Sequence, residues 1–324
     1  MTYSRKTEEA LEALSRLREN PDLPAVHGEV SHYLAHKSNA VVAKAAKLAA
    51  GFELHDARPL LVAAFHRFMK EAATSDRGCS AKTEIVRALE TLGVPEANVF
   101  LTGLRHVQME GSFGPPVDTA AALRAACAMG LIHMNHPGAV LEIVPLLVDR
   151  EIDARIGAVR ALSYSGTPEA EALLRFKALQ PEASADVMTE CFAALLAIAP
   201  ARSLAFVGAQ LDAADPATME AAAIALGQSR QAAAVEILKD KWRPAANAST
   251  RSALLLGLAL ARDENAVEFL FSLVETATEN IAVQALTALA MYRHDARIRG
   301  RTESLVDQRN SKALQRTLAS EFQP

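Results

Sequence analysis

The sequence predicts an all-α chain, folded as a right-handed α-solenoid of stacked two-helix repeats. Half of its 324 residues are hydrophobic and only 5% are aromatic, so its apolar surface comes from alanine, leucine and valine, which favour closely packed helices. An alanine-rich segment recurs every 30 to 37 residues, a spacing that fits a two-helix unit. No run alternates apolar and polar residues with a period of two, so no sheet is expected.

The clearest copy of the repeat is the segment 153–162, which reads Asp-Ala-Arg-Ile-Gly-Ala-Val-Arg-Ala-Leu. Ala154, Ala158 and Ala161 fall on one helical stripe, where small residues let neighbouring helices approach closely. Related copies follow at intervals of 37, 36, 33, 31, 33 and 30 residues, and their anchors are Ala88, Ala125, Ala161, Ala194, Ala225, Leu258 and Ala288. With an earlier copy at 41–51, the pattern predicts about eight helical hairpins in one domain that spans 1–324.

The remaining helices fill the intervals between these copies. A cap helix is expected over 1–23, a polar cap helix over 309–324, and amphipathic helices over 58–72, 137–148, 170–179 and 266–274. Helix starts are indicated by candidate N-cap residues and by early prolines, namely Asp56, Asp118, Ser184, Asp263, Pro59, Pro168 and Pro216.

The segment 153–162, followed by Gly166-Thr167-Pro168-Glu169-Ala170, resembles HEAT and HEAT-like repeats, the group that includes the phycobilisome-lyase type. Weaker copies extend the resemblance over most of the chain, and they imply a fold rather than an activity. In such solenoids the second helix of each hairpin commonly lines the concave surface. The resemblance therefore implies that a partner would bind there.

Seven basic residues lie on the predicted second helices of the first half of the chain. They are Lys44, Lys47, Lys82, Arg87, Arg124, Arg155 and Arg160. If they face inward together, they form a basic binding stripe. In the alternative interpretation they pair with acidic residues of adjacent repeats, for which Glu84, Glu151 and Asp153 are available.

The least repeat-like segment is 108–118, where glycine and proline interrupt one unit between its two helices. It contains Glu110 and Phe113, and His106 lies just before it. Inserted loops often carry the binding function of a rigid scaffold, so these three residues complete the candidate binding set. The alternative is a linker whose Phe113 packs into the core.

Catalytic and metal-binding motifs are weak in this sequence. The pairs His32/His36 and His133/His136 have spacings that suit two ligands each, but no spacing dictates a third. Deoxyhypusine hydroxylase, a HEAT-like metalloenzyme, uses paired His-Glu motifs, and no His-Glu dipeptide occurs here. Cys79 lies near a helix start beside Lys82, a place where a reactive thiol or an anion site can form. An ordinary buried cysteine is the favoured interpretation. No metal and no cofactor are expected.

The charge balance disfavours nucleic acid as a partner, since 34 basic residues face 38 acidic ones, for a net charge of −4. Three widely spaced cysteines, Cys79, Cys127 and Cys191, indicate a reducing compartment. The N-terminus lacks the apolar stretch of a signal peptide, and no apolar run is long enough to span a membrane. These features predict a cytoplasmic protein that does not bind membranes.

The sequence favours a non-catalytic scaffold or adaptor that binds a protein or peptide on its concave face. One alternative is a DNA-repair protein, by resemblance to HEAT-like alkylpurine DNA glycosylases, with Trp242 inside a cluster of Lys239, Lys241 and Arg243. A second alternative, suggested by the name of the repeat group, is a cofactor or chromophore lyase. An enzyme would have to assemble its site across several repeats.

Overall fold

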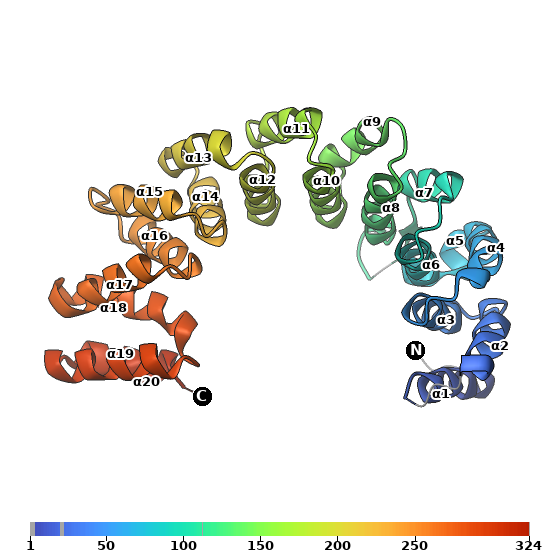
Figure 1. The fold of residues 1–324 in the computed structure, drawn as a ribbon, viewed down its shortest axis with the longest axis horizontal. Coiled ribbons are helices and arrows are strands. Elements are labelled where there is room, and N and C mark those ends of the chain that lie inside the picture. Colours follow the sequence, from blue (N-terminus) through green and yellow to red (C-terminus); the bar gives the residue numbers. More distant parts are fainter. Residues whose placement is uncertain (1–3, 20–22, 112, 324) are drawn as a thin grey trace. The chain divides into compact units, whose positions relative to one another are not determined.

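The computed structural model describes residues 4–19, 23–111 and 113–323. Contacts between residues divide the chain into two compact units, Met1–Ala170 and Glu171–Pro324, called unit 1 and unit 2. Each unit is a stack of helical hairpins, so the predicted all-α solenoid fold of stacked two-helix repeats is confirmed (Figure 1).

Unit 1 contains two layers of helices. Its elements are α1 (Arg5–Glu19), α2 (Leu23–Leu34), α3 (Asn39–Gly51), η1 (His55–Ala57), α4 (Arg58–Met69), α5 (Ala72–Ser75), η2 (Arg77–Cys79), α6 (Ser80–Thr91), α7 (Ala97–Leu104), β1 (Met109–Glu110), β2 (Val117–Asp118), α8 (Ala121–His133), α9 (Ala139–Ile143), η3 (Val144–Val148) and α10 (Ile152–Ser165). Helices α3, α6, α8 and α10 pack side by side in one layer, and α2, α4, α7 and α9 with η3 form the other (Figure 1). The first set corresponds to the predicted second helices, and we call it the second-helix layer.

Small residues set the spacing within this layer, as the alanine stripe predicts. A Cβ atom on Gly157 of α10 would lie 2.3 Å from the Cβ of Ala125 on α8. Ala154, Ala158 and Ala161 are all buried on the same face of α10. The helices therefore touch almost backbone to backbone, which accounts for the alanine content without large core side chains.

Unit 2 repeats the same two-layer arrangement. Its elements are α11 (Pro168–Ala178), which begins before the unit boundary, α12 (Ala185–Ile198), α13 (Pro200–Ala209), η4 (Gln210–Asp212), α14 (Pro216–Gln228), α15 (Ala232–Trp242), α16 (Ala248–Leu260), α17 (Glu264–Thr276), α18 (Glu279–Leu289), η5 (Ala290–Tyr292), α19 (Ala296–Arg309) and α20 (Lys312–Glu321). Here α12, α14, α16, α18 and α20 form the second-helix layer.

Helix starts agree with the sequence at most of the predicted positions. Ser184 and Asp263 cap α12 and α17 by accepting backbone N–H bonds from Val187 and Ala266. Asp56 lies inside η1, and Asp118 ends a strand, so neither caps an α-helix as expected. Helix α1 lies within the predicted cap range 1–23, of which 1–3 and 20–22 fall outside the described residues, and α20 lies within 309–324.

The prediction that no sheet occurs is wrong at one place. Strands β1 and β2 pair antiparallel, with Met109 opposite Asp118 and Glu110 opposite Val117. Each strand has two residues, too few for a period of two to be visible in the sequence. Elsewhere in the described ranges the regular elements are helices, and none of these helices is long and apolar enough to cross a membrane.

Candidate functional site

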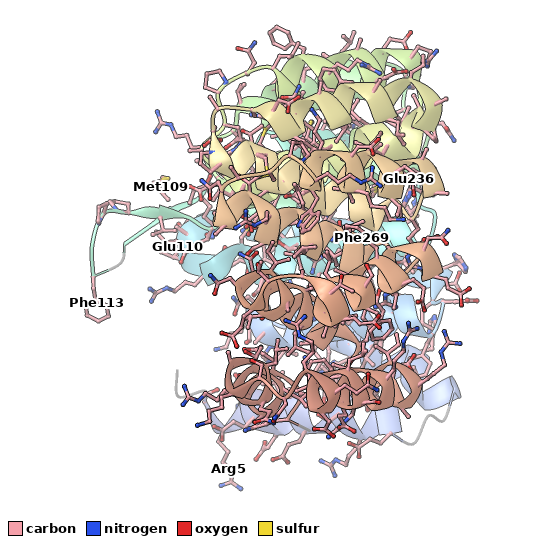
Figure 2. The ribbon with its side chains drawn as sticks, turned by 90° about the vertical axis from the view of Figure 1, so that its left-hand side faces the viewer. Arg5, Met109, Glu110, Phe113, Glu236 and Phe269 are labelled. Atoms are coloured by element: carbon pink, nitrogen blue, oxygen red, sulfur yellow. The ribbon has the colours of Figure 1, made fainter. Side chains whose placement is uncertain are left out.

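The β-hairpin protrudes from unit 1 and carries an aromatic ring at its tip (Figure 2). Phe113 has a relative exposure of 116%, so it is not packed into the core. The side chains of Val107, Met109 and Val117 are also exposed, by 57%, 53% and 50%. Apolar side chains gathered on one exposed segment are typical of a surface that another molecule covers. We call this segment the 107–118 hairpin; its residue 112 lies outside the described residues.

Glu110 fixes the first strand of the hairpin to η2, the short helix before α6. Its Oε1 accepts hydrogen bonds from the Gly78 backbone N–H at 2.7 Å, Gln108 Nε2 at 2.7 Å and Thr119 Oγ1 at 2.8 Å. Its Oε2 lies 4.0 Å from Arg77 Nε. Burial alone would raise the pKa of Glu110, but these hydrogen bonds outweigh burial and lower the pKa. Glu110 is therefore a charged anchor at neutral pH.

Asp118 and Arg124 fix the second strand to α8. Arg124 is buried, and its Nη1 donates to Asp118 Oδ2 at 2.8 Å and to the His106 carbonyl at 2.9 Å. Its Nη2 donates to Asp149 Oδ1 at 2.9 Å. Burial would raise the pKa of Asp118, yet backbone N–H groups, including that of Gln108, and the Arg124 guanidinium lower it. The ion pairs thus join both ends of the hairpin to the helical stack.

A buried ion pair lies beneath this anchor. Asp76 and Lys82 are both 0% exposed, and Lys82 Nζ lies 3.1 Å from Asp76 Oδ2. The Asp76 carboxylate also accepts the backbone N–H groups of Ala81 and Lys82 at the start of α6. The Asp76 carbonyl accepts a 2.8 Å bond from Gln108 Nε2. The hairpin is therefore bonded directly to a group that holds α6 in place.

His106 belongs to the base of the hairpin rather than to its tip. Its Nε2 lies 3.1 Å from Gln108 Oε1, and its carbonyl accepts the Arg124 bond. Burial is the main cause that lowers the pKa of His106, and only the Gln108 bond and Asp118 oppose it. The candidate residues thus divide into two roles. His106 and Glu110 hold the hairpin, while Phe113 is presented to solvent.

The predicted basic stripe is corrected at two of its positions. Lys82 and Arg124 are buried in the ion pairs described above, so neither offers its charge to a ligand at the surface. Arg155 donates from Nη1 to the carbonyls of Asp149 and Arg150, which end the preceding segment. These three cations serve the fold. Lys82 and Arg124 pair with buried carboxylates, and Arg155 bonds carbonyls that have no partner within a helix.

Three other residues of the predicted basic stripe, Lys47, Arg87 and Arg160, lie at the surface. Arg87 is exposed and pairs with Glu84 at 2.8 Å, and Lys47 lies 3.6 Å from the same carboxylate. Pairing with an acid of an adjacent repeat is the alternative that the sequence left open, and the Lys47–Glu84 contact has that form. Arg160 is exposed on α10. The second-helix layer of unit 1 therefore carries much less free positive charge than the sequence suggests.

Four residues of the anchor were not identified in the sequence. They are Asp76, Gln108, Thr119 and Asp149, and each contacts residues distant in sequence. Only Asp76 has a local signal, since an acidic residue just before a helix is a common cap. The contacts of Gln108 and Thr119 depend on how the hairpin folds back, and that of Asp149 depends on how the segment before α10 packs against α8. No periodicity in the sequence reports either arrangement.

Several of the candidate chemical groups outside the hairpin have structural partners. Burial raises the pKa of Cys79 and of Cys191 to about 12, so both thiols stay protonated and unreactive. His133 Nδ1 lies 2.8 Å from Glu90 Oε1, and His36 Nδ1 accepts the Ser38 backbone N–H. Among the described residues no group of three or more histidine, cysteine or carboxylate side chains is placed to hold a metal ion.

The cationic cluster around Trp242 in unit 2 is neutralised by acids. Lys239, Lys241 and Arg243 pair with Glu236, Asp212 and Asp240, respectively. The Trp242 ring packs edge to face against Phe269, at a centroid distance of 5.3 Å. Paired cations release few counterions on binding DNA, so this cluster adds no support to the nucleic-acid alternative.

Comparison with known proteins gives no family. No protein-family model and no curated protein matches the sequence. Among solved structures, an engineered protein is 17% identical, with a TM-score of 0.35 over 96% of this chain and 91% of that chain. Human deoxyhypusine hydroxylase in complex with glycerol is 16% identical, with a TM-score of 0.29 over 88% of this chain and 90% of that one. Likenesses this loose assign neither a family nor a function.

Proposed function

We propose that this protein is a non-catalytic adaptor that binds a protein or peptide partner through unit 1, with Phe113 of the 107–118 hairpin as the main anchor. The observation that carries this proposal is the full exposure of Phe113 on a hairpin whose base is fixed by buried ion pairs. An aromatic ring in water forgoes roughly 1.5–3 kcal/mol of burial energy, which a partner that covers it would recover. The surrounding second-helix layer would supply the rest of the interface.

The rigidity of the hairpin base supports the same proposal. Binding is weakened when loops and side chains must be ordered on contact, at about 0.5–1.5 kcal/mol for each flexible side chain. Here Glu110 and Arg124 hold both strands before any partner arrives. Aromatic residues, phenylalanine among them, are enriched at the cores of protein interfaces.

Placement among HEAT-like repeat proteins is part of the proposal, supported by hairpin stacking and by the period of 30 to 37 residues. A reducing, cytoplasmic location is proposed as well, because all three cysteines are free and buried. A thiol in such a position contributes to packing and does not require an oxidising compartment.

The test compares partner recovery by the wild-type protein and by Phe113→Ala, expressed at native level with a small tag. Loss of a central aromatic anchor is expected to cost about 2 kcal/mol or more, which is roughly thirtyfold in Kd. A partner that depends on Phe113 is then purified and titrated against both proteins. Phe176→Ala is the matched control, since Phe176 is an exposed phenylalanine on α11.

Thermal unfolding should be the same for Phe113→Ala and wild type, because the ring contributes no buried area. The proposal fails if every partner is retained by Phe113→Ala. It also fails if the two alanine variants lose the same partners to the same extent.

A further inference from the structure

A second candidate surface lies on the second-helix layer of unit 2. A groove of about 340 Å³ runs between α16 and α18 and reaches α14, and the residues that line it include Glu220, Ser252, Leu256, Val283, Gln284 and Thr287. Ser252 and Leu256 lie one turn apart on α16, as do Val283 and Thr287 on α18. Rows of this kind form ridges and grooves into which another helix packs.

Glu220 is the charged residue among the described residues that line this groove. It is exposed, and within the described part of the chain its carboxylate forms no hydrogen bond or ion pair. The guanidinium of Arg251 borders the groove, because its Nε lies 3.5 Å from Oε1 of the lining residue Gln284, and its Nη1 donates to the carbonyls of Ala245 and Ala246. The groove therefore combines apolar and hydroxyl walls with one carboxylate that has no direct hydrogen-bond or ion-pair partner among the described residues.

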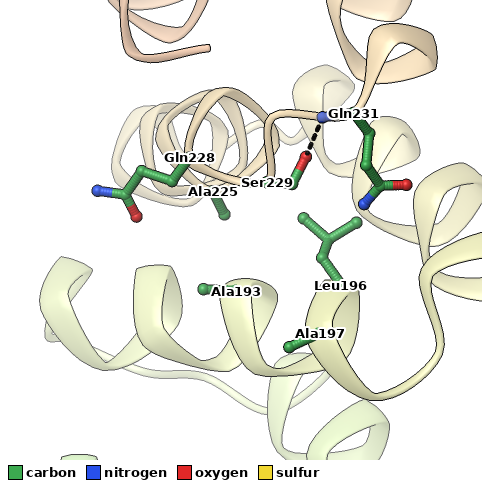
Figure 3. A pocket seen from close by; sticks show the side chains of 7 residues that line it. All are labelled: Ala193, Leu196, Ala197, Ala225, Gln228, Ser229 and Gln231. Carbon is green, nitrogen blue, oxygen red and sulfur yellow. Dashed lines mark hydrogen bonds between the residues drawn. The ribbon is translucent and has the colours of Figure 1, made fainter. Parts of the chain in front are cut away.

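A second hollow on the second-helix layer of unit 2 is lined by uncharged residues (Figure 3). It lies between α12 and α14, has a volume of about 260 Å³, and is floored by alanine side chains and Leu196. The side-chain amides of Gln228 and Gln231 flank it, and within the described residues they form no hydrogen bond. Glu220 and Gln228 are eight residues apart on α14, which is about 12 Å along its axis.

We infer that this groove binds a helical segment of a partner protein that carries an apolar stripe with one lysine or arginine at its end. The stripe would lie between α16 and α18 against Leu256 and Val283, and the cation would meet Glu220. Helices dock in this way when a hydrophobic groove is bordered by complementary charge. This site is distinct from the 107–118 hairpin, since it lies in unit 2. It selects a partner with a positive charge, whereas the hairpin selects a partner that buries Phe113.

The test uses two synthetic helical peptides of about 16 residues, long enough to span about 24 Å. Both have a leucine stripe, and they differ only in a lysine or a glutamate at the end of that stripe. Fluorescence anisotropy with the full chain should show the lysine peptide binding about fivefold to tenfold more tightly than its glutamate twin. Glu220→Lys should reverse this preference.

Two further variants make the outcome specific to the groove. Thr287→Trp places a large ring in it and should weaken both peptides by at least about tenfold. Glu275→Lys reverses an exposed charge on α17 outside the groove and should leave both affinities unchanged. Circular dichroism melts confirm that each variant is folded.

Equal binding of the two peptides, or an unchanged preference in Glu220→Lys, would overturn the inference. Self-association of the chain that Thr287→Trp abolishes would assign the groove to a second copy and overturn it as well. Neither result bears on Phe113, whose role is measured with a different variant and a different partner.

Discussion

Single arginines show how a charge that suggests binding can serve the fold. Arg124, Arg155 and Arg251 all lie on second helices, and each donates to carbonyls that follow the first helix of the same hairpin. Carbonyls at and just after a helix end have no hydrogen-bond partner within the helix, so a guanidinium that reaches them stabilises the turn. The period of the sequence places an arginine on one face of a helix. Whether a backbone carbonyl lies within reach of that arginine depends on the path of the segment that joins the two helices of the hairpin. For Arg124 and Arg155 the sequence left two roles open, ligand binding and structural pairing, and their hydrogen bonds are structural.

Glu110 leads to a prediction about pH at the scale of one residue. Hydrogen bonds hold its folded pKa below its ordinary value in spite of burial, and the pKa of Asp118 is lowered in the same direction. Such groups contribute stability that is complete above their unfolded pKa and is lost as pH falls through the folded pKa. The 107–118 hairpin should therefore loosen in acid, from the ordinary carboxyl range downward.

Amide hydrogen exchange of the segment 105–120, corrected for the intrinsic rate at each pH, measures this loosening. Protection in wild type should decrease as the pH is lowered from neutral. Glu110→Gln should exchange faster at neutral pH and respond less to acid, because it lacks the titrating group. A wild-type profile that stays flat down to the onset of global unfolding would contradict the assignment of Glu110 as anchor.

The packing of α14 against α16 provides a prediction at the scale of the element. A Cβ on Gly227 would lie 2.1 Å from the carbonyl oxygen of Gly257, so the two backbones are in direct contact. Gly227→Ala should gain helix propensity but force the helices apart, with a net loss of about 2 kcal/mol in the free energy of unfolding. Gly300 lies inside α19 with open space around it, and Gly300→Ala should stabilise by about 0.5–1 kcal/mol.

Chemical denaturation of both variants checks the pair, since the same substitution is expected to act with opposite sign. Stabilisation by Gly227→Ala would show that the α14–α16 contact is looser than the structure indicates. Gly300→Ala is the control. It shows that any destabilisation by Gly227→Ala comes from the α14–α16 contact rather than from an added methyl group on a helix.

At the scale of elements, the sequence predicts the helices well because each one carries its own signal. Alanine anchors, early prolines and caps such as Ser184 fall where helices begin or pack. The segment 108–118 was recognised as an interruption through its glycines and prolines. Its strands were not, because β1 and β2 depend on pairing with one another and leave no pattern of their own. The exposure of Phe113 likewise follows from hairpin geometry, so the sequence left two alternatives open.

For the whole molecule, stacking of hairpins means that stability is approximately a sum of local terms. In such arrays each repeat contacts only its neighbours, so damage in one place need not spread far. The sequence predicts a single continuous solenoid, which stays a prediction, and contacts group residues into Met1–Ala170 and Glu171–Pro324. Whether these units unfold together is a question about cooperativity that a disruptive substitution in each of them can answer.

Lys82→Met leaves the buried Asp76 carboxylate without its partner and should cost about 3–5 kcal/mol. Because its effects are transmitted through neighbours, native-state hydrogen exchange should lose protection mainly in α3, α6 and α8. Gly227→Ala should instead lose protection mainly in α14 and α16. Lys47→Met, which removes an exposed cation, should change the protection free energy of neither group of helices by more than about 1 kcal/mol. If Lys82→Met lowered protection equally in both units, the chain would behave as one cooperative domain, and the local-sum description would fail.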